Sequence, residues 1–189
     1  MQSALLKTDA EEGYGILTGE ELYALGNTKC CELIEGNLIP MSPTGYTHGI
    51  IENQFGRILG NYVRRHKLGM VMVGEVGIYT RRNPDTVRGA DVIFVSNQRL
   101  AQSQSRSWLD VAPELIVEIL SPGDLWTDVG DKLEEYFSIG VNQVWIADPR
   151  RREVFVYTSP LKSVLCTAKI AAPEILPGFE ADVADFFYN

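Results

Sequence analysis

Two carboxylates stand inside runs of apolar residues that read as strands. Glu118 lies within Leu115–Leu120 (LIVEIL), and Asp91 lies within Ala90–Val95 (ADVIFV). Runs this apolar are typical of strands buried on both faces, where an unpartnered carboxylate is costly. A divalent cation shared by both acids would offset that cost, because hard cations prefer carboxylate oxygens. The alternatives are an arginine partner for each acid, or a position at a strand mouth in water.

The helix expected after the Glu118 strand carries a lysine that could reach these acids. Asp128 and Lys132 are one turn apart on the helix expected after the Glu118 strand. They could form an ordinary ion pair worth about 0.2–0.5 kcal/mol. Alternatively, Lys132 leans over the acids, where it would orient or deprotonate a water and offset charge developing on a phosphate. The intervening Ser121-Pro122-Gly123 is either a plain turn or a loop at a strand's carboxyl end, a common place for ligand sites.

Three further polar residues are weaker candidates. Glu32 could face the same cleft or could be a solvent-facing acid of a hairpin. His48, in the first turn of a long helix, could bind a phosphate or donate a proton, or could have a capping or structural role. Asp148 precedes Pro149 and is interpreted as a turn former. Other hydrolase and nucleotide-binding motifs (GxSxG, Walker A, GxGxxG) do not occur, and the chain has only two histidines.

The elements that would position these residues follow from periodicity and turn residues. Thr18 and Glu21 form a capping box at the start of a short helix, and Thr47 is the expected N-cap of a long amphipathic one. The predicted elements are a hairpin over 31–41, helices over 47–67 and 125–139, strands over 70–80, 90–96, 115–120, 143–147 and 153–158, a polar loop with a short helix over 97–111, and a weak strand near Val164. This order predicts an α/β fold with one central mixed sheet and helices on its faces.

The composition favours a single soluble domain. The chain has 189 residues, of which 45% are hydrophobic and 22% charged, which is ordinary for a globular protein. We expect residues 16–189 to form one domain after a loosely ordered segment over 1–15. The odd number of cysteines, two of them adjacent, favours the reducing cytoplasm. The first residues lack the pattern of a signal peptide, and no apolar run reaches the roughly 18 residues of a membrane span.

The net charge of −8 counts against a nucleic-acid partner, because such proteins usually carry a basic patch. Local basic clusters could act against this background or could be solvated turns and helix ends. The clusters are Arg64-Arg65-His66-Lys67, Arg81-Arg82 with Arg88, and Arg150-Arg151-Arg152.

An ordered set of motifs carries a resemblance to a known family. The set comprises Glu32-Leu-Ile-Glu-Gly, Met41-Ser-Pro with His48, Ala90-Asp-Val, Pro113-Glu-Leu-Ile-Val-Glu-Ile-Leu-Ser-Pro, Asp128 with Lys132 and Tyr136, and Gly140-Val-Asn-Gln-Val-Trp-Ile-Ala-Asp-Pro. Together they resemble the Uma-type family of putative restriction endonucleases, formerly a domain of unknown function. The resemblance covers the chain from about Thr18 to Phe187.

The resemblance implies the restriction endonuclease-like PD-(D/E)XK fold. That core places an Asp and a Glu on adjacent strands around Mg²⁺, with a Lys two residues after the Glu. The acids carry over to Asp91 and Glu118. Ala90 stands where the pattern has Pro, which only shapes the strand. Leu120 stands where the pattern has Lys, so the lysine is expected from the following helix as Lys132.

We therefore predict a metal-dependent endonuclease acting on nucleic acid, with DNA as the expected substrate. Asp91, Glu118 and the carbonyl of Ile119 would bind Mg²⁺ or Mn²⁺, while Lys132 helps to position the attacking water and Glu32 completes the shell through a water. A homodimer would be the simplest way to cut two strands. The main alternative, favoured by the acidic charge and Leu120, is a nucleic-acid-binding or protein-interaction module whose site has decayed. An enzyme that hydrolyses another phosphate ester or a nucleotide is a third reading.

Overall fold

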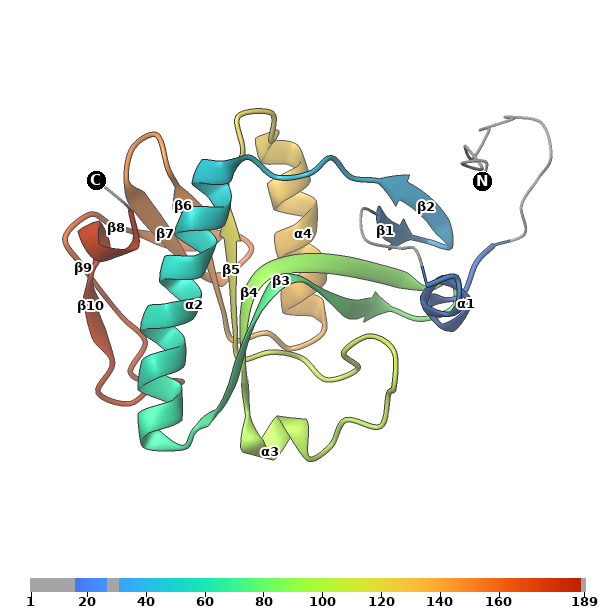
Figure 1. Cartoon of the computed structure of the whole chain (residues 1–189), viewed down its shortest axis with the longest axis horizontal. Helices are drawn as coiled ribbons and strands as arrows, with labels where there is room; N and C mark the ends of the chain where they lie inside the picture. Colours follow the sequence, from blue (N-terminus) through green and yellow to red (C-terminus); the bar gives the residue numbers. More distant parts are fainter. Residues whose placement is uncertain (1–15, 27–30, 188–189) are drawn as a thin grey trace, which may run out of the picture.

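A central sheet organises the chain in the computed structural model, which describes residues 16–26 and 31–187. Seven strands follow the order β2-β1-β4-β5-β6-β7-β8, and β3 pairs with β4 off this path (Figure 1). The β5–β6 pair is parallel and its neighbours are antiparallel, so the sheet is mixed, as predicted. The strands are β1 (Cys31–Ile34), β2 (Asn37–Pro40), β3 (Gly69–Arg81), β4 (Thr86–Ser96), β5 (Leu115–Ile119), β6 (Gln143–Asp148), β7 (Glu153–Ser159) and β8 (Lys162–Cys166).

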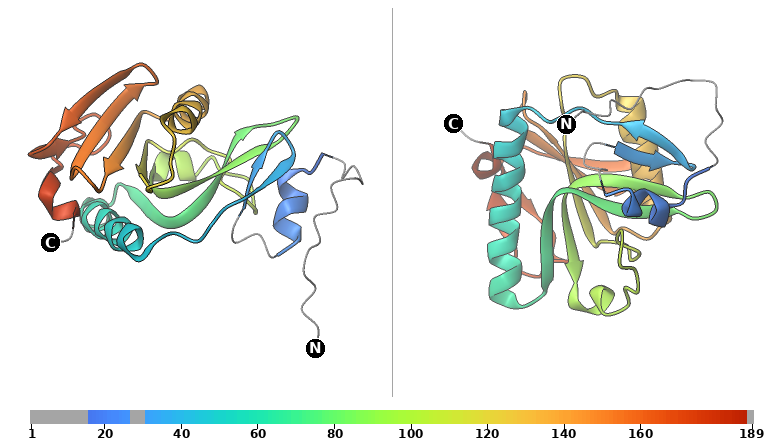
Figure 2. Two further views of the ribbon diagram at one scale, coloured as in Figure 1. Left: turned by 90° about the horizontal axis from the view of Figure 1, so that it is seen from above. Right: turned by 45° about the vertical axis from the view of Figure 1, so that its right-hand side comes forward.

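Helices cover both faces of this sheet. The helices of the described residues are α1 (Gly19–Ala24), α2 (Tyr46–His66), α3 (Asn97–Leu100), α4 (Trp126–Ser138) and the 3₁₀ helix η1 (Val183–Phe186), and the two long ones, α2 and α4, cover the two faces. Seen from above, α2 and α4 lie on opposite sides of the strands (Figure 2). A separate two-stranded sheet of β9 (Lys169–Ala171) and β10 (Glu180–Asp182) was not predicted.

The two long helices each bury the apolar stripe that their sequence predicts. On α2, Ile51, Phe55 and Leu59 enter a cluster with side chains of β4, β5 and β6. On α4, Leu133 and Tyr136 enter the cluster on the other face. Full burial of one such side chain stabilises the fold by about 1.5–3 kcal/mol. Packing therefore fixes both helices against the strands that carry the two candidate acids.

The strands β4 and β5 are neighbours, as the metal hypothesis requires. Their last paired residues are Val92 and Val117, so Asp91 and Glu118 are the next residues along the two strands. β4 begins at Thr86 rather than at the predicted Ala90. Its polar and glycine-containing start lacks a strand-like apolar pattern, yet Thr86–Gly89 pair with β3.

A bulge interrupts β3 beside the centre of the sheet. The register shifts between Val73 and Val76, and Gly74 and Glu75 have φ angles of 93° and 55°. Glycine adopts such angles at little cost, whereas a glutamate seldom does. A Cβ atom at Gly89 would lie 2.8 Å from Oε2 of Glu75. The bulge therefore brings the Glu75 carboxylate against Gly89 of β4.

Helix ends test the predicted capping residues. The capping box of Thr18 and Glu21 is confirmed, and Gly140 follows α4 with a φ of 97°, as expected for a helix stop. The prediction for Thr47 is wrong: α2 begins at Tyr46, and its N-cap Gly45 makes no side-chain hydrogen bond. Thr47 is the second residue of the helix and cannot cap it.

Some sequence predictions fall on residues that lie outside the described ranges. They include the loosely ordered segment over 1–15 and Cys30. Across residues 16–26 and 31–187, no helix is both long and apolar enough to cross a membrane.

Candidate active site

Glu118 lies near the carboxyl end of β5 and faces α4. Its side chain is 15% exposed. The Tyr136 hydroxyl donates a hydrogen bond of 2.6 Å to Oε1, and Nζ of Lys132 lies 3.7 Å from Oε2. Tyr136 and Lys132 are one turn apart on α4, so a single face of this helix supplies both partners.

Asp91 contacts the other long helix and the backbone of β5. The residue is 4% exposed. Its Oδ2 atom accepts a hydrogen bond of 2.7 Å from the Ile119 amide and lies 3.2 Å from Nε2 of His48 on α2. Buried Asp91 thus joins the end of β5 to the first turn of α2.

Lys132 reaches a third acid, Glu32 of β1. Its Nζ atom lies 3.3 Å from Oε1 of Glu32 and donates a 3.4 Å hydrogen bond to the carbonyl of Gly89. No ion pair between Lys132 and Asp128 occurs within the described part of the chain. The helix directs this lysine toward the acids of the sheet, and its role in catalysis stays a prediction.

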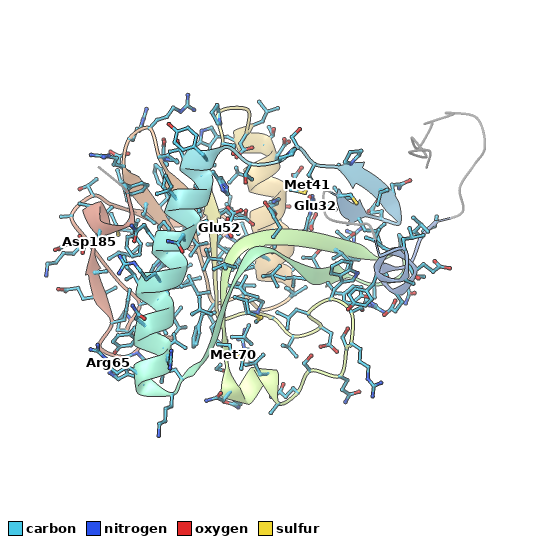
Figure 3. The ribbon with its side chains drawn as sticks, in the orientation of Figure 1. Glu32, Met41, Glu52, Arg65, Met70 and Asp185 are labelled. Carbon is cyan, nitrogen blue, oxygen red and sulfur yellow. The ribbon has the colours of Figure 1, made fainter. Side chains whose placement is uncertain are left out.

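Two acids in this region were missing from the sequence prediction. Glu52 lies one turn after His48 on α2. Figure 3 labels it on this helix, and labels Glu32 nearer the β1–β2 hairpin to which it belongs. Ligand atoms of His48, Glu52 and Asp91 all lie within 4.8 Å of one another. Glu75, at the β3 bulge, is the second missed acid. A signal for it exists in the sequence: Gly74 breaks an otherwise apolar strand, and bulges often occur next to active sites.

Burial and mutual repulsion perturb the protonation of these acids. Burial raises the pKa of Glu118 to about 8; the negative charges of Asp91 and Glu75 add to the rise, while Lys132 and the Tyr136 hydrogen bond oppose it. Burial also raises the pKa of Glu75 to about 7, again with repulsion from Asp91. The pKa of Glu52 rises for the same two reasons. The site therefore holds more carboxylates than its own cations neutralise.

The donor set fits a hard divalent cation. Mg²⁺ and Mn²⁺ prefer carboxylate, carbonyl and water oxygens, and an imidazole nitrogen suits Mn²⁺ better than Mg²⁺. Although burial lowers the pKa of His48, its hydrogen bond and attraction to Asp91 raise the pKa overall. Its Nδ1 atom is buried and has no hydrogen-bond partner among the described residues. A bound cation would reduce the repulsion among the carboxylates, which the basic groups of the site do not fully neutralise.

Two cavities give access to this region. A cleft of about 650 Å³ is bordered by Glu52, Glu75 and Gly89 together with the segment that leads into α2. A smaller recess of about 90 Å³ lies between Glu118 and Lys132 on the α4 side. Of the described residues that line these two cavities, only Lys132 is basic.

The predicted site residues thus come from five elements. Lys132 (α4) contacts both Glu118 (β5) and Glu32 (β1). Asp91 (β4) contacts His48 (α2) and, through the Ile119 amide, the backbone of β5. The carboxylates could bind a cation, and the Lys132 ammonium would lie beside it. Metal-assisted hydrolysis of a phosphodiester uses groups of these two kinds.

Comparison with known proteins identifies the family and the fold. The family model Uma2, described as a putative restriction endonuclease, matches residues 20–184. The crystal structure of a putative nuclease from Anabaena variabilis matches with a TM-score of 0.74 at 20% sequence identity, covering 90% of this chain and 97% of that chain. At this identity the likeness shows the fold alone. No curated protein matches the chain.

Proposed function

Because the chain belongs to the Uma2 family of putative restriction endonucleases, we propose that it is a metal-dependent nuclease that hydrolyses phosphodiester bonds in nucleic acid, with DNA as the expected substrate. The observation that carries this proposal is that Asp91 and Glu118 are neighbours on two adjacent strands, next to the Val92–Val117 pair, and that Lys132 of α4 lies 3.7 Å from Glu118. Packing alone would favour apolar residues at the two acid positions, since Asp91 is 4% exposed and the Glu118 side chain 15% exposed.

In this proposal Asp91 and Glu118 hold Mg²⁺ or Mn²⁺ together with the carbonyl of Ile119. His48 and Glu52 are further donors beside Asp91, because their ligand atoms lie within 4.8 Å of it. When bound, the cation supplies Lewis acidity toward the phosphate and lowers the pKa of a bound water.

Lys132 acts in this site as a positive charge. Although burial lowers the pKa of a lysine, attraction to Glu118 and Glu32 raises the pKa of Lys132 above its ordinary value. A lysine held protonated cannot accept a proton from water at neutral pH. It instead stabilises negative charge that develops on the phosphate.

Glu75 is our candidate for the group that accepts a proton. Its pKa of about 7 is close to neutral pH, where a general base works most efficiently. Its carboxylate lies against Gly89 at the wall of the larger cleft. We assign Glu75 this role, which the sequence prediction did not include.

A decayed binding module remains the second candidate because one observation favours it. Lys132 is the single basic residue among the described residues that line the two cavities, and a polyanion needs more cations than that. A bound divalent ion would supply part of the missing charge. The two candidates therefore differ in whether metal binding leads to cleavage.

The test is a metal titration followed by cleavage assays. Mn²⁺ and Mg²⁺ binding to the metal-free protein would be measured by calorimetry, and duplex DNA, single-stranded DNA and RNA would be offered as substrates. We expect metal-dependent cleavage of at least one polynucleotide by the wild type and none by Asp91→Asn. Lys162→Ala, which changes an exposed lysine of β8, is the matched control. Metal binding without cleavage of any polynucleotide would favour the module.

A further inference from the structure

Glu32 has both carboxylate oxygens committed to the protein. The residue is 6% exposed. Its Oε2 atom pairs with Nη1 of Arg88 at 2.9 Å, and its Oε1 atom accepts the Gly89 amide at 3.0 Å and faces Lys132 at 3.3 Å. A carboxylate so engaged is poorly placed to bind a metal-associated water, the role first predicted for it. Its contacts instead point toward Lys132.

Arg88 of β4 is the residue that fixes Glu32. Its side chain is 10% exposed. Besides the contact with Glu32, Arg88 forms a two-pronged pair with Glu135 of α4: Nη2 lies 2.6 Å from Oε1, and Nε lies 2.8 Å from Oε2. Bidentate pairs of this kind fix geometry as well as charge. One buried guanidinium therefore ties β1 to α4.

The same helix face carries Lys132, three residues before Glu135, so both side chains face the sheet. Glu135 is also fixed from β3, because the Thr80 hydroxyl donates a 2.8 Å hydrogen bond to its Oε2 atom. Arg88 thus influences the position of Lys132 in two ways, both through another residue. Glu32 draws the ammonium directly, and Glu135 fixes the helix that carries it.

We propose that Arg88 is a positioning residue that acts through Glu32 and Glu135 to hold the Lys132 ammonium beside Glu118. This inference rests on the proposed function only where it concerns the rate of cleavage. The placement of Lys132 itself can be measured without any substrate.

Lysine could not replace Arg88 in this role. Arginine presents its donors in a planar fork that serves two carboxylates at once, whereas a lysine ammonium is a compact charge on a flexible stem. Arg88→Lys keeps the charge and loses the fork. Either Glu32 or Glu135 then loses a hydrogen bond that fixes it, and the Lys132 side chain becomes more mobile and more accessible to solvent.

The experiment compares Arg88→Lys with Arg99→Lys. Arg99 is a suitable control because it also bridges several groups, namely the carbonyls of Ala112 and Pro113 and the side chains of Asn142 and Glu114, and none of these belongs to the candidate site. Acetic anhydride labelling of the metal-free proteins, read by peptide mass spectrometry with exposed Lys162 as the internal reference, measures the accessibility of Lys132. We expect Arg88→Lys to raise the Lys132 labelling rate at least about threefold and Arg99→Lys to leave it unchanged.

Cleavage provides the second measurement. Arg88→Lys should lower kcat by about 10- to 100-fold, since small displacements of a catalytic group have effects of this size, while KM and the Mn²⁺ Kd stay within about threefold. Arg88→Lys and Glu32→Gln should be non-additive, because both act on one contact. If no variant, including the wild type, cleaves any polynucleotide, the proposed function fails, and the labelling rates still decide the role of Arg88.

Thr80→Val covers the case in which Arg88→Lys does not fold. It removes one hydrogen bond to Glu135 and should raise the Lys132 labelling rate to a smaller extent. A folded Arg88→Lys protein with the wild-type labelling rate would overturn the proposal. An unfolded Arg88→Lys protein together with unchanged labelling in Thr80→Val would overturn it too, because Arg88 would then be purely structural.

Discussion

The substitution Glu118→Gln should stabilise the metal-free protein near pH 8. Burial raises the pKa of Glu118 from 4.5 to about 8, and the charges of Asp91 and Glu75 contribute to the rise. A group with a higher pKa in the folded than in the unfolded chain takes up a proton on folding. Its contribution to stability is complete below pH 4.5 and is lost as the pH rises through about 8. Glutamine does not ionise and so does not lose this contribution.

The size of the effect follows from the same pKa. The rise from 4.5 to about 8 corresponds to at most about 5 kcal/mol at pH 8 and above. Glutamine gives up part of the attraction that Lys132 feels, because Nζ lies 3.7 Å from Glu118, although Glu32 still neutralises the ammonium. We therefore expect a net gain of about 1–3 kcal/mol in the free energy of unfolding. For a chain of this size that is a rise of roughly 3–10 °C in Tm.

The assay is thermal unfolding of wild type and Glu118→Gln in the presence of a chelator, at pH 5 and at pH 8. Glu75, with a pKa of about 7, contributes to the pH dependence of both proteins. Because its charge repels that of Glu118, the difference between the two proteins measures Glu118 together with this repulsion. The difference should nearly vanish at pH 5. Glu134→Gln, which neutralises an exposed acid on the same helix, serves as the control and should change Tm little at either pH.

Metal addition reverses the order of stability. Saturating Mn²⁺ should stabilise the wild type, since a ligand that binds only the folded state raises the unfolding free energy, and should not stabilise Glu118→Gln. A Glu118→Gln protein that is less stable than the wild type at pH 8 without metal would refute the reasoning. Glu118 would then be chiefly an ion-pair partner of Lys132.

Three further substitutions test the site. Lys132→Ala should leave Mn²⁺ binding by calorimetry nearly unchanged and lower the cleavage rate by about 10²-fold or more; an equal rate would remove Lys132 from the mechanism. Asp91→Asn should abolish Mn²⁺ binding yet keep circular dichroism intact, because the amide oxygen can still accept the Ile119 hydrogen bond. Gly89→Ala places a Cβ 2.8 Å from the mobile end of Glu75; Tm should fall by only a few degrees, whereas the acidic limb of the pH–rate profile should shift.

Most of the helices and strands could be predicted from the sequence, because the local residue patterns agree with the packing that the structure shows. The hairpin around Gly36, the stripe on α2 and the apolar β5 each follow from a periodicity that the tertiary structure uses unchanged. The same holds for Glu118 and Asp91, whose presence in apolar strands is anomalous in the sequence itself. A charged residue in a buried run is an observation that needs no structure to be noticed.

The missed acids depend on tertiary contacts instead. Glu52 occupies a position on α2 that the sequence alone reads as the polar flank of an amphipathic helix, and only its proximity to Asp91 gives it a role. Glu75 requires a strand to bulge and to adopt a left-handed φ, which a period-two pattern does not anticipate. Likewise the start of β4 at Thr86 depends on pairing with β3 rather than on its own apolar residues.

The place of the lysine shows why a linear motif is not enough for this site. Position 120, two residues after Glu118, holds a leucine that packs against the apolar cluster under α4, so a charged ammonium there would lose that packing. Lys132 brings an ammonium to within 3.7 Å of Glu118 from the helix instead. The sheet itself would fix the position of a lysine on the strand. The position of a lysine on a helix depends in addition on how firmly the helix packs against the sheet. The contacts of Arg88 with Glu135 and of Tyr136 with Glu118 fix α4 against the sheet. A site whose lysine comes from the helix and not from the strand therefore depends on these contacts.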